Sequence, residues 1–216
     1  GLQNAGIEVY LESVLPQTMA ALDRDQIIVS VGGDSVEDYV GLCRRLQREV
    51  GARIAALELN AACPNVAHGA GFYSRDPGAA RELVAAARAE VDLPLFVKLN
   101  TNYPNFVEVA QAIEQAGADA IYTTNTPLGM KIDWRTGRPA LGNVRGPICG
   151  PAIRPIGVLR TWELYESVGI PIVASGGVRT WEDALEYLMA GAAAVGVGCA
   201  QFVRPDAAAV ILDGLE

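Results

Sequence analysis

Short apolar segments alternate with longer amphipathic ones along the chain. The short segments hold five or six residues each, several are rich in β-branched side chains, and most adjoin Gly, Asn or Asp. Segments of this kind are typical of buried β-strands. They predict strands at Ile27–Val31, Ile54–Leu59, Leu95–Leu99, Ala120–Thr124, Pro171–Ser175 and Ala193–Val197.

Helical periodicity returns between the predicted strands. In Val36–Val50, apolar residues recur every three or four positions. Ser35 directly precedes this run and Asp38 lies within it, and the two residues fit a capping box. Thr180 with Asp183 repeats the capping pattern, and the inward face there is predicted to hold Ala184, Leu185, Leu188 and Met189. Further helices are predicted over Ile7–Leu22, from Pro77 (after an Asp76 cap) to Val91, from Asn105 to before Gly117, over Arg154–Val168 and over Pro205–Leu215.

The order of these elements indicates a parallel sheet covered by helices. Two features favour a barrel over a doubly wound sheet. Glycine turns follow the last two strands, where barrels bind phosphate, and no GxGxxG follows the first strand. We therefore predict an α/β fold, a (β/α)8 TIM barrel reduced to about six βα units. Residues 1–216 would form a single, N-terminally incomplete domain.

Composition narrows the function classes. The chain has 17 Lys and Arg against 25 Asp and Glu, a net charge of −8, and half of its residues are apolar. This acidic balance argues against nucleic acid and anionic membranes as partners. Nor does any apolar stretch reach the ~18–20 residues that span a bilayer. Four cysteines without a CxxC pair argue against a metal or iron–sulfur site and against a disulfide framework, which favours a reducing, cytoplasmic location.

One cysteine stands out by its position. Cys63 follows a strand end and opens a 14-residue polar loop that reaches Asp76. Loops of this length often form lids or binding sites, so the thiol is a candidate nucleophile or proton-transfer base. His68 lies five residues further on, and a Cys–His hydrolase is an alternative that lacks an accompanying oxyanion group. Cys43, on a helix face, is predicted to be a small core residue.

Other candidate groups also lie at strand ends, which meet at one mouth in a barrel. Lys98 sits inside an otherwise apolar strand and could stabilise a developing negative charge. Amides can donate and accept hydrogen bonds together, which suits a planar pyrimidine. The amide and hydroxyl candidates are Asn60, Asn65, Asn125 and Thr126.

Glycine turns supply the candidate phosphate site. Gly176 and Gly177 follow one strand, and Gly198 with Cys199 follows the next. Glycine lets backbone N–H groups approach phosphate oxygens closely, so a phosphorylated ligand such as flavin mononucleotide (FMN) would fit. Gly150 offers a third place for such a contact.

Several stretches resemble the dihydroorotate dehydrogenases, and the likeness covers nearly the whole chain. They are the loop NAACPNVAHG (60–69), VKLN (97–100), the segment Asn125–Pro155, ASGGV (174–178) and VGVGCA (195–200). CPNVAHG is similar to the soluble class 1 enzymes that use a cysteine base. The form of the loop and the stretch from NT to GPAIRP are most like the catalytic subunit of the NAD-linked class 1B.

The resemblance implies an FMN-dependent oxidation of dihydroorotate to orotate in pyrimidine biosynthesis. Cys63 would be the base that takes a proton from C5 while a hydride leaves C6 for flavin N5. It also implies a partner subunit with FAD and an iron–sulfur cluster that passes electrons to NAD, and a homodimeric core. Substrate positions would be Gly1, Leu2, Asn60, Asn65, Asn125 and Thr126; flavin positions would be Asn60, Lys98, Thr124, Gly150, Gly176, Gly177, Gly198 and Cys199.

The sequence also departs from the family pattern. Ala62 stands where Ser is frequent, Cys199 where Thr is usual, and Ser30 where relatives carry a flavin-contacting Asn. The first two strands of the family barrel lie outside this sequence. The alternatives are a dihydropyrimidine dehydrogenase acting on uracil or thymine, whose loops read more like CPHGMG, and an inactive flavin-binding barrel fragment. Fumarate-using relatives share the CPN loop, which leaves the electron acceptor open.

Overall fold

The computed structural model describes residues 4–23, 26–62 and 72–216. Each of the six predicted strands is present, with bounds within two residues of the prediction. They are β1 (Ile28–Val31), β2 (Ala56–Asn60), β3 (Leu95–Lys98), β4 (Ala120–Thr123), β9 (Ile172–Ser175) and β10 (Ala194–Gly196).

The predicted helices are also present between these strands. The first is a continuous run of α1 (Gly6–Val9), a π-helical turn η1 (Tyr10–Val14) and α2 (Leu15–Ala21). The others in the described residues are α3 (Val36–Val50), η3 (Gly51–Arg53), α4 (Pro77–Arg88), α5 (Phe106–Gln115), η4 (Pro151–Ile153), α6 (Arg154–Tyr165), α7 (Trp181–Met189), α8 (Ala200–Val203) and α9 (Ala207–Leu215).

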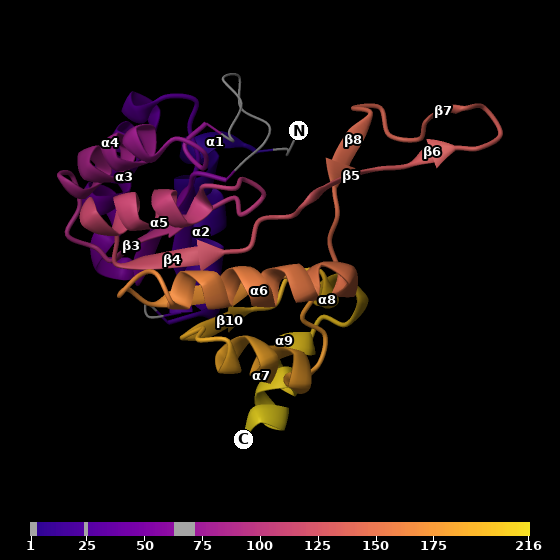
Figure 1. Ribbon diagram of the computed structural model, residues 1–216. Helices are drawn as coiled ribbons and strands as arrows, with labels where there is room; N and C mark the ends of the chain where they lie inside the picture. Colours follow the sequence, from indigo (N-terminus) through magenta and orange to yellow (C-terminus); the bar gives the residue numbers. More distant parts are fainter. Residues whose placement is uncertain (1–3, 24–25, 63–71) are drawn as a thin grey trace. The chain divides into compact units, whose positions relative to one another are not determined.

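The described residues, drawn in Figure 1, group into two compact units. The first unit comprises residues within 1–99 and 108–121, and the second comprises residues within 100–107 and 122–216.

In the first unit, β1, β2 and β3 are parallel neighbours. Val29 pairs with Leu57 and Val31 with Leu59, and all four side chains are buried. Helix α3 contacts both β1 and α4, and its own buried residues include Cys43. Since side chains alternate across a strand, the residues between these apolar positions point to the other face, which is where the polar candidates of this unit lie.

The predicted capping boxes are confirmed. The backbone N–H of Asp38 donates to Ser35 Oγ over 3.2 Å, and the N–H of Ser35 donates to Asp38 Oδ2 over 3.1 Å. Thr180 and Asp183 make the same reciprocal pair at the start of α7. Each cap satisfies N–H groups that the helix leaves unpaired and contributes about 1 kcal/mol.

In the second unit, β9 and β10 are parallel neighbours, and α6 packs against both β9 and α7, which in turn contacts α9. The core cluster here contains Ala174, Val178, Ala184, Tyr187, Ala192 and Ile211. The predicted inward face of α7 was wrong at Leu185 and Met189, which are 38% and 76% exposed. The face of the helix that carries Tyr187 points inward instead, because the hydroxyl of Tyr187 forms a hydrogen bond inside the unit.

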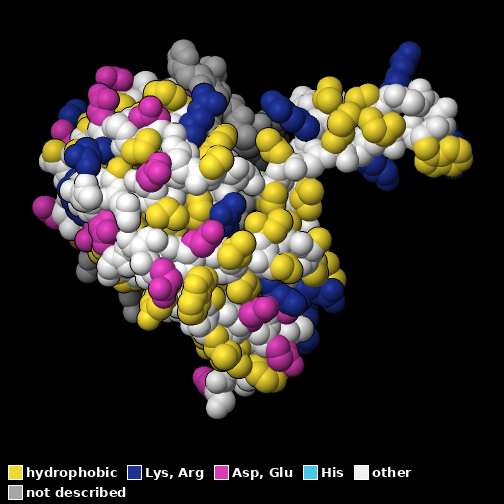
Figure 2. Space-filling view, viewed as in Figure 1, with side chains coloured by type: hydrophobic (Ala, Val, Ile, Leu, Met, Phe, Trp, Pro, Cys, Tyr) yellow, Lys and Arg dark blue, Asp and Glu magenta, His cyan; other side chains and the backbone are white. Residues whose placement is uncertain are grey.

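The second unit also carries an arm that the apolar pattern did not predict. Strand β5 (Leu128–Met130) pairs antiparallel with β8 (Arg145–Pro147), and β6 (Ile132–Asp133) with β7 (Arg138–Pro139). Nearly all of its residues are exposed, so no core-facing alternation marks these short strands. Hydrophobic and basic side chains cover the arm in Figure 2.

Candidate active site

In the first unit, two predicted site residues lie side by side. Asn60 ends β2 and Lys98 ends β3, and the two are register partners on these parallel strands. Adjacent strands lie about 4.8 Å apart, so the amide and the ammonium group leave the sheet from neighbouring positions at its carboxyl edge. Both residues are half-buried. This arrangement can present a hydrogen-bonding amide and a positive charge to one ligand.

Two hydrogen bonds fix the backbone at this edge. The hydroxyl of the buried Tyr39 on α3 donates to the carbonyl oxygen of Asn60 over 2.8 Å. The hydroxyl of Ser74, also buried, donates to the carbonyl oxygen of Ala61 over 2.8 Å. Sequence reasoning missed both residues because their role is visible only as a contact with a distant backbone group. Of the predicted site residues, Gly1, Leu2, Cys63 and Asn65 lie outside the described residues, as does His68.

A buried carboxylate shares the polar face of the sheet. Glu58 in β2 is 8% exposed and accepts a hydrogen bond from the hydroxyl of Ser30 in β1 over 2.7 Å. Sequence reasoning missed Glu58, although a glutamate in an apolar strand is a visible signal. Ser30 also lines a cavity of about 390 Å³ between β1 and the first helical run; the other lining residues include Asn4, Ile7, Tyr10 and Gly32.

In the second unit, the segment after β4 is anchored to the end of β9. The N–H of the buried Thr124 donates to the Ser175 carbonyl oxygen over 3.3 Å. The side chain of Asn102 donates to the carbonyl oxygen of Thr126 over 3.2 Å. Asn125 and Thr126 are half-buried. These bonds hold the backbone of a predicted substrate segment in one place.

The predicted glycine turns of the second unit meet one another. Gly150, Gly176 and Gly177 have φ values of 89°, 121° and 77°, which residues other than glycine rarely adopt. A Cβ on Gly177 would lie 2.8 Å from the carbonyl oxygen of Gly150, so the two turns are in contact. A Cβ on Gly150 or Gly198 would meet no atom within 4 Å. The backbone of Gly177 thus packs against that of Gly150, while the space beside Gly150 and Gly198 is open. This arrangement fits a binding site for a phosphorylated ligand.

Two cysteines connect the Gly150 turn with the turn after β10. Cys149 and Cys199 are both exposed, and Cys199 stands at the N-terminal cap of α8. A hydrogen bond to the Cys199 thiol, followed by burial, raises the pKa of the Cys149 thiol. Cys43 is different: burial raises the pKa of its thiol to about 12, and it is fully buried. The prediction that Cys43 is a core residue is confirmed.

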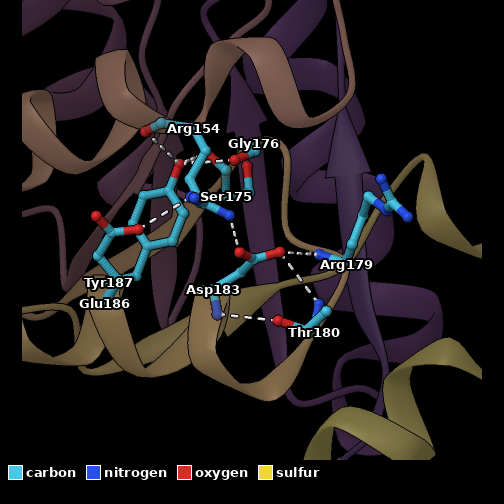
Figure 3. A network of polar contacts seen from close by, with 8 residues as sticks. All are labelled: Arg154, Ser175, Gly176, Arg179, Thr180, Asp183, Glu186 and Tyr187. Atoms are coloured by element: carbon cyan, nitrogen blue, oxygen red, sulfur yellow. Dashed lines mark hydrogen bonds and ion pairs between the residues drawn. The ribbon is translucent and has the colours of Figure 1, made fainter.

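A polar network lies behind the Gly176–Gly177 turn (Figure 3). The Arg154 guanidinium forms ion pairs with Asp183 and, over 2.9 Å, with Glu186. The hydroxyl of Tyr187 reaches the carbonyl oxygen of Gly176. Sequence reasoning did not single out Tyr187 or Arg154, since nothing in their spacing shows that they contact the turn.

Neither a membrane span nor a metal cluster is found in the part of the chain that the structure describes. No helix there is long and apolar enough to cross a bilayer. No group of three or more His, Cys, Asp or Glu side chains there is placed to hold a metal ion.

Sequence comparison identifies similar proteins over the full chain. The family model described as dihydroorotate dehydrogenase matches residues 1–216. The chain is 41% identical over 216 residues to the catalytic subunit of dihydroorotate dehydrogenase B (NAD(+)) of Desulforamulus reducens, covering 100% of this chain and 70% of that protein. It is 44% identical over 205 residues to the same subunit of Bacillus pumilus, covering 95% of this chain and 65% of that protein.

Structure comparison agrees on the fold. The crystal structure of DHODH in complex with ferulenol from Eimeria tenella aligns with a TM-score of 0.79 and 21% identity, covering 100% of this chain and 65% of that one. The predicted fold class, a dihydroorotate dehydrogenase barrel reduced to part of its length, is confirmed. The chain spans 65–70% of the length of the proteins it matches.

Proposed function

Because the chain belongs to the dihydroorotate dehydrogenase family, we propose that it carries out the oxidation of dihydroorotate to orotate in pyrimidine biosynthesis. Members of this family are flavin-dependent oxidoreductases. The observation that carries the proposal is the pairing of Asn60 with Lys98 at the carboxyl edge of the first unit, in a chain matched by the family model over its whole length.

We propose a set of substrate-binding groups that are mostly amides. Asn60, with Asn65 five residues further along the sequence, offers amides that match the alternating C=O and N–H groups of a dihydropyrimidine ring. Asn125 and Thr126 offer a third amide and a hydroxyl, and hydrogen bonds at Thr124 and Thr126 hold their backbone in place. The proposed set is completed by Gly1 and Leu2.

The cofactor is proposed to be FMN. Its phosphate would be held by backbone N–H groups of the glycine turns, which present open space beside Gly150 and Gly198. When bound, the flavin supplies the acceptor for the hydride that leaves C6 of dihydroorotate. The residues proposed to hold it are Asn60, Lys98, Thr124, Gly150, Gly176, Gly177, Gly198 and Cys199.

Two side chains are proposed to act on charge and protons at the reacting ring. The Lys98 ammonium group would stabilise negative charge that develops beside it, which is most effective where water is excluded. Cys63 would remove the proton from C5 of dihydroorotate. An unperturbed thiol has a pKa of ~8.5, so the rate should rise with pH as the thiolate fraction grows.

We further propose two protein partners. The relatives from Desulforamulus reducens and Bacillus pumilus are named catalytic subunits of NAD(+)-linked enzymes. The name implies a second subunit, and we propose that this chain has such a partner, which carries FAD and an iron–sulfur cluster and delivers electrons to NAD. A homodimeric core and a cytoplasmic location complete the proposal. The acceptor is tested by supplying NAD with the partner, or fumarate without it.

Substrate choice separates this proposal from its rivals. The FMN-loaded chain, given an artificial electron acceptor, is expected to produce orotate from dihydroorotate and to leave dihydrouracil unchanged. Faster turnover of dihydrouracil would favour a dihydropyrimidine dehydrogenase. A chain that retains no flavin absorbance after purification and FMN loading would favour an inactive barrel fragment.

A further inference from the structure

Tyr187 on α7 is a buried phenol surrounded by backbone carbonyl groups. Its hydroxyl lies 2.8 Å from the carbonyl oxygen of Gly176, 3.2 Å from that of Ser175 and 3.5 Å from that of Arg154. One O–H can donate only one proton at a time, so the shortest contact, with Gly176, takes it most often. The side chain is 0% exposed, and its ring belongs to the core cluster.

Helix α6 leaves room for this hydroxyl. A Cβ on Gly157 would lie 2.0 Å from the Tyr187 oxygen, so any larger residue there would displace the phenol. Burial, followed by the charge of Glu186, raises the pKa of Tyr187 above its ordinary value. The hydroxyl therefore keeps its proton, and remains a donor, throughout the neutral pH range.

The contact with Gly176 orients the next peptide group. In a trans peptide plane the C=O and the following N–H point in opposite directions. Because the carbonyl of Gly176 points to the buried phenol, the N–H of Gly177 points away from it. Within the described residues, neither Gly176 nor Gly177 donates a hydrogen bond from its N–H.

Neighbouring donors and charges are already used inside the unit. The N–H groups of Arg179 and Thr180 donate to the Asp183 carboxylate over 2.9 and 3.1 Å. The Arg154 guanidinium is paired with Asp183 and Glu186 (Figure 3). The N–H groups of Arg179 and Thr180 at the start of α7 are thus taken, whereas those of Gly176 and Gly177 donate to no group in the described residues.

We propose that Tyr187 is a positioning residue for flavin phosphate binding. Its hydroxyl holds the Gly176 carbonyl so that the N–H of Gly177 is presented to the phosphate. This inference rests on the proposed function, because it concerns the phosphate of the proposed FMN. Tyr187 touches neither the substrate nor the reacting atoms in this role.

The test compares FMN with riboflavin, which lacks the phosphate. Flavin affinity is measured by fluorescence titration for the wild-type chain, Tyr187→Phe and Tyr165→Phe. Tyr165 is an exposed phenol in the same unit and serves as the matched control. Tyr187→Phe is expected to weaken FMN binding about tenfold and to change riboflavin binding less than twofold. Tyr165→Phe is expected to change neither affinity.

Several results would overturn the proposal. An equal loss of affinity for both flavins, accompanied by a lower thermal midpoint, would show a merely structural role. Unchanged FMN binding by Tyr187→Phe would remove the residue from the phosphate-binding site, and a wild-type chain that binds FMN no tighter than riboflavin would remove that site itself. A wild-type chain that binds neither flavin would instead contradict the proposed function.

A second measurement uses the wild-type chain alone and does not depend on the variant folding. The amide signal of Gly177 in an isotope-labelled chain is followed by NMR as each flavin is added. FMN is expected to shift the signal strongly, whereas riboflavin is expected to leave it near its original position. The same shift with both flavins, or none with FMN, would contradict the proposed presentation of this N–H.

Discussion

Asn60 and Lys98 are register partners at the carboxyl ends of two parallel strands, so a neutral amide and a positive charge share one edge of the sheet. Tyr39 holds the Asn60 end of this pair through the carbonyl oxygen, over 2.8 Å. The pair therefore stands on a rigid strand edge rather than on a loop. Such placement favours electrostatic stabilisation, because the groups need little reorganisation when charge develops.

Replacing Lys98 with Met tests its charge. The substitution keeps most of the apolar stem and removes the ammonium group, so the rate of flavin reduction by dihydroorotate is expected to fall about 100-fold. Stopped-flow reduction of the FMN-loaded chain measures this rate. Lys131→Met, on the exposed arm, is the control and should leave the rate unchanged. Equal rates for wild type and Lys98→Met would exclude electrostatic stabilisation by Lys98.

Tyr39→Phe tests the anchoring of the strand edge. Loss of the hydroxyl leaves the Asn60 carbonyl without this donor, and the free energy of unfolding is expected to fall by about 1–2 kcal/mol. Urea denaturation provides the measurement. Tyr165→Phe removes a phenol hydroxyl from an exposed position and should cost less than about 0.5 kcal/mol. A similar loss of unfolding free energy in both variants would mean that the hydrogen bond of Tyr39 does not stabilise the fold.

The contact between the glycine turns predicts a sharp contrast between two Gly→Ala substitutions. At Gly177 the added Cβ would meet the carbonyl oxygen of Gly150 at 2.8 Å, in a backbone with φ of 77°, so about 1–3 kcal/mol of stability should be lost. At Gly41, an exposed position in α3 with no atom near the added Cβ, stability should rise by up to about 1 kcal/mol. Thermal and urea unfolding of both variants measure the difference. A neutral Gly177→Ala would show that the turn has room for a side chain.

The buried thiol of Cys43 predicts a pH dependence of stability. Its pKa is raised from 9.0 to about 12 by burial, so the folded state keeps the proton more tightly than the unfolded state. This contribution is fully present below pH 9 and is lost as the pH rises through the window between 9 and 12. Between pH 8 and 10.5, the wild-type chain should therefore lose more stability than Cys43→Ala does. An equal loss of stability in the wild type and in Cys43→Ala would show that the Cys43 thiol is not the source of this pH dependence.

The same burial predicts slow alkylation of Cys43. At pH 8 the folded chain should react with iodoacetamide at the exposed Cys149 and Cys199 well before Cys43. Mass spectrometry of peptides from a time course measures each site. Rapid labelling of Cys43 without unfolding would contradict its place in the core.

Much of the fold was predictable because local patterns and tertiary packing agree. Leu57 and Val97 are buried in strands that stand out in the sequence as short, mostly apolar runs, and the Ser35 cap is a local interaction. The arm around Trp134 was missed because it contributes to no core and therefore carries no apolar period. On α7, Met189 was predicted to face inward only because it is apolar. In the structure Tyr187 faces inward instead, and its hydroxyl forms hydrogen bonds there.

The candidate site was predictable only where its residues end strands. Lys98 and the Gly176 turn are conspicuous in sequence because a charge or a glycine pair interrupts an apolar run. Glu58 was open to the same reasoning but was overlooked. Tyr187 and Tyr39 act through carbonyl oxygens far away in the chain, so no local pattern reveals them.

Anaerobic addition of dihydroorotate to the FMN-loaded chain tests the central claim most directly, with Cys63→Ala and Cys43→Ala measured beside the wild type. The yellow flavin absorbance should bleach rapidly in the wild type and in Cys43→Ala, and far more slowly in Cys63→Ala. A flavin that stays oxidised in the wild type, or that bleaches equally fast without the Cys63 thiol, would contradict this account of the site.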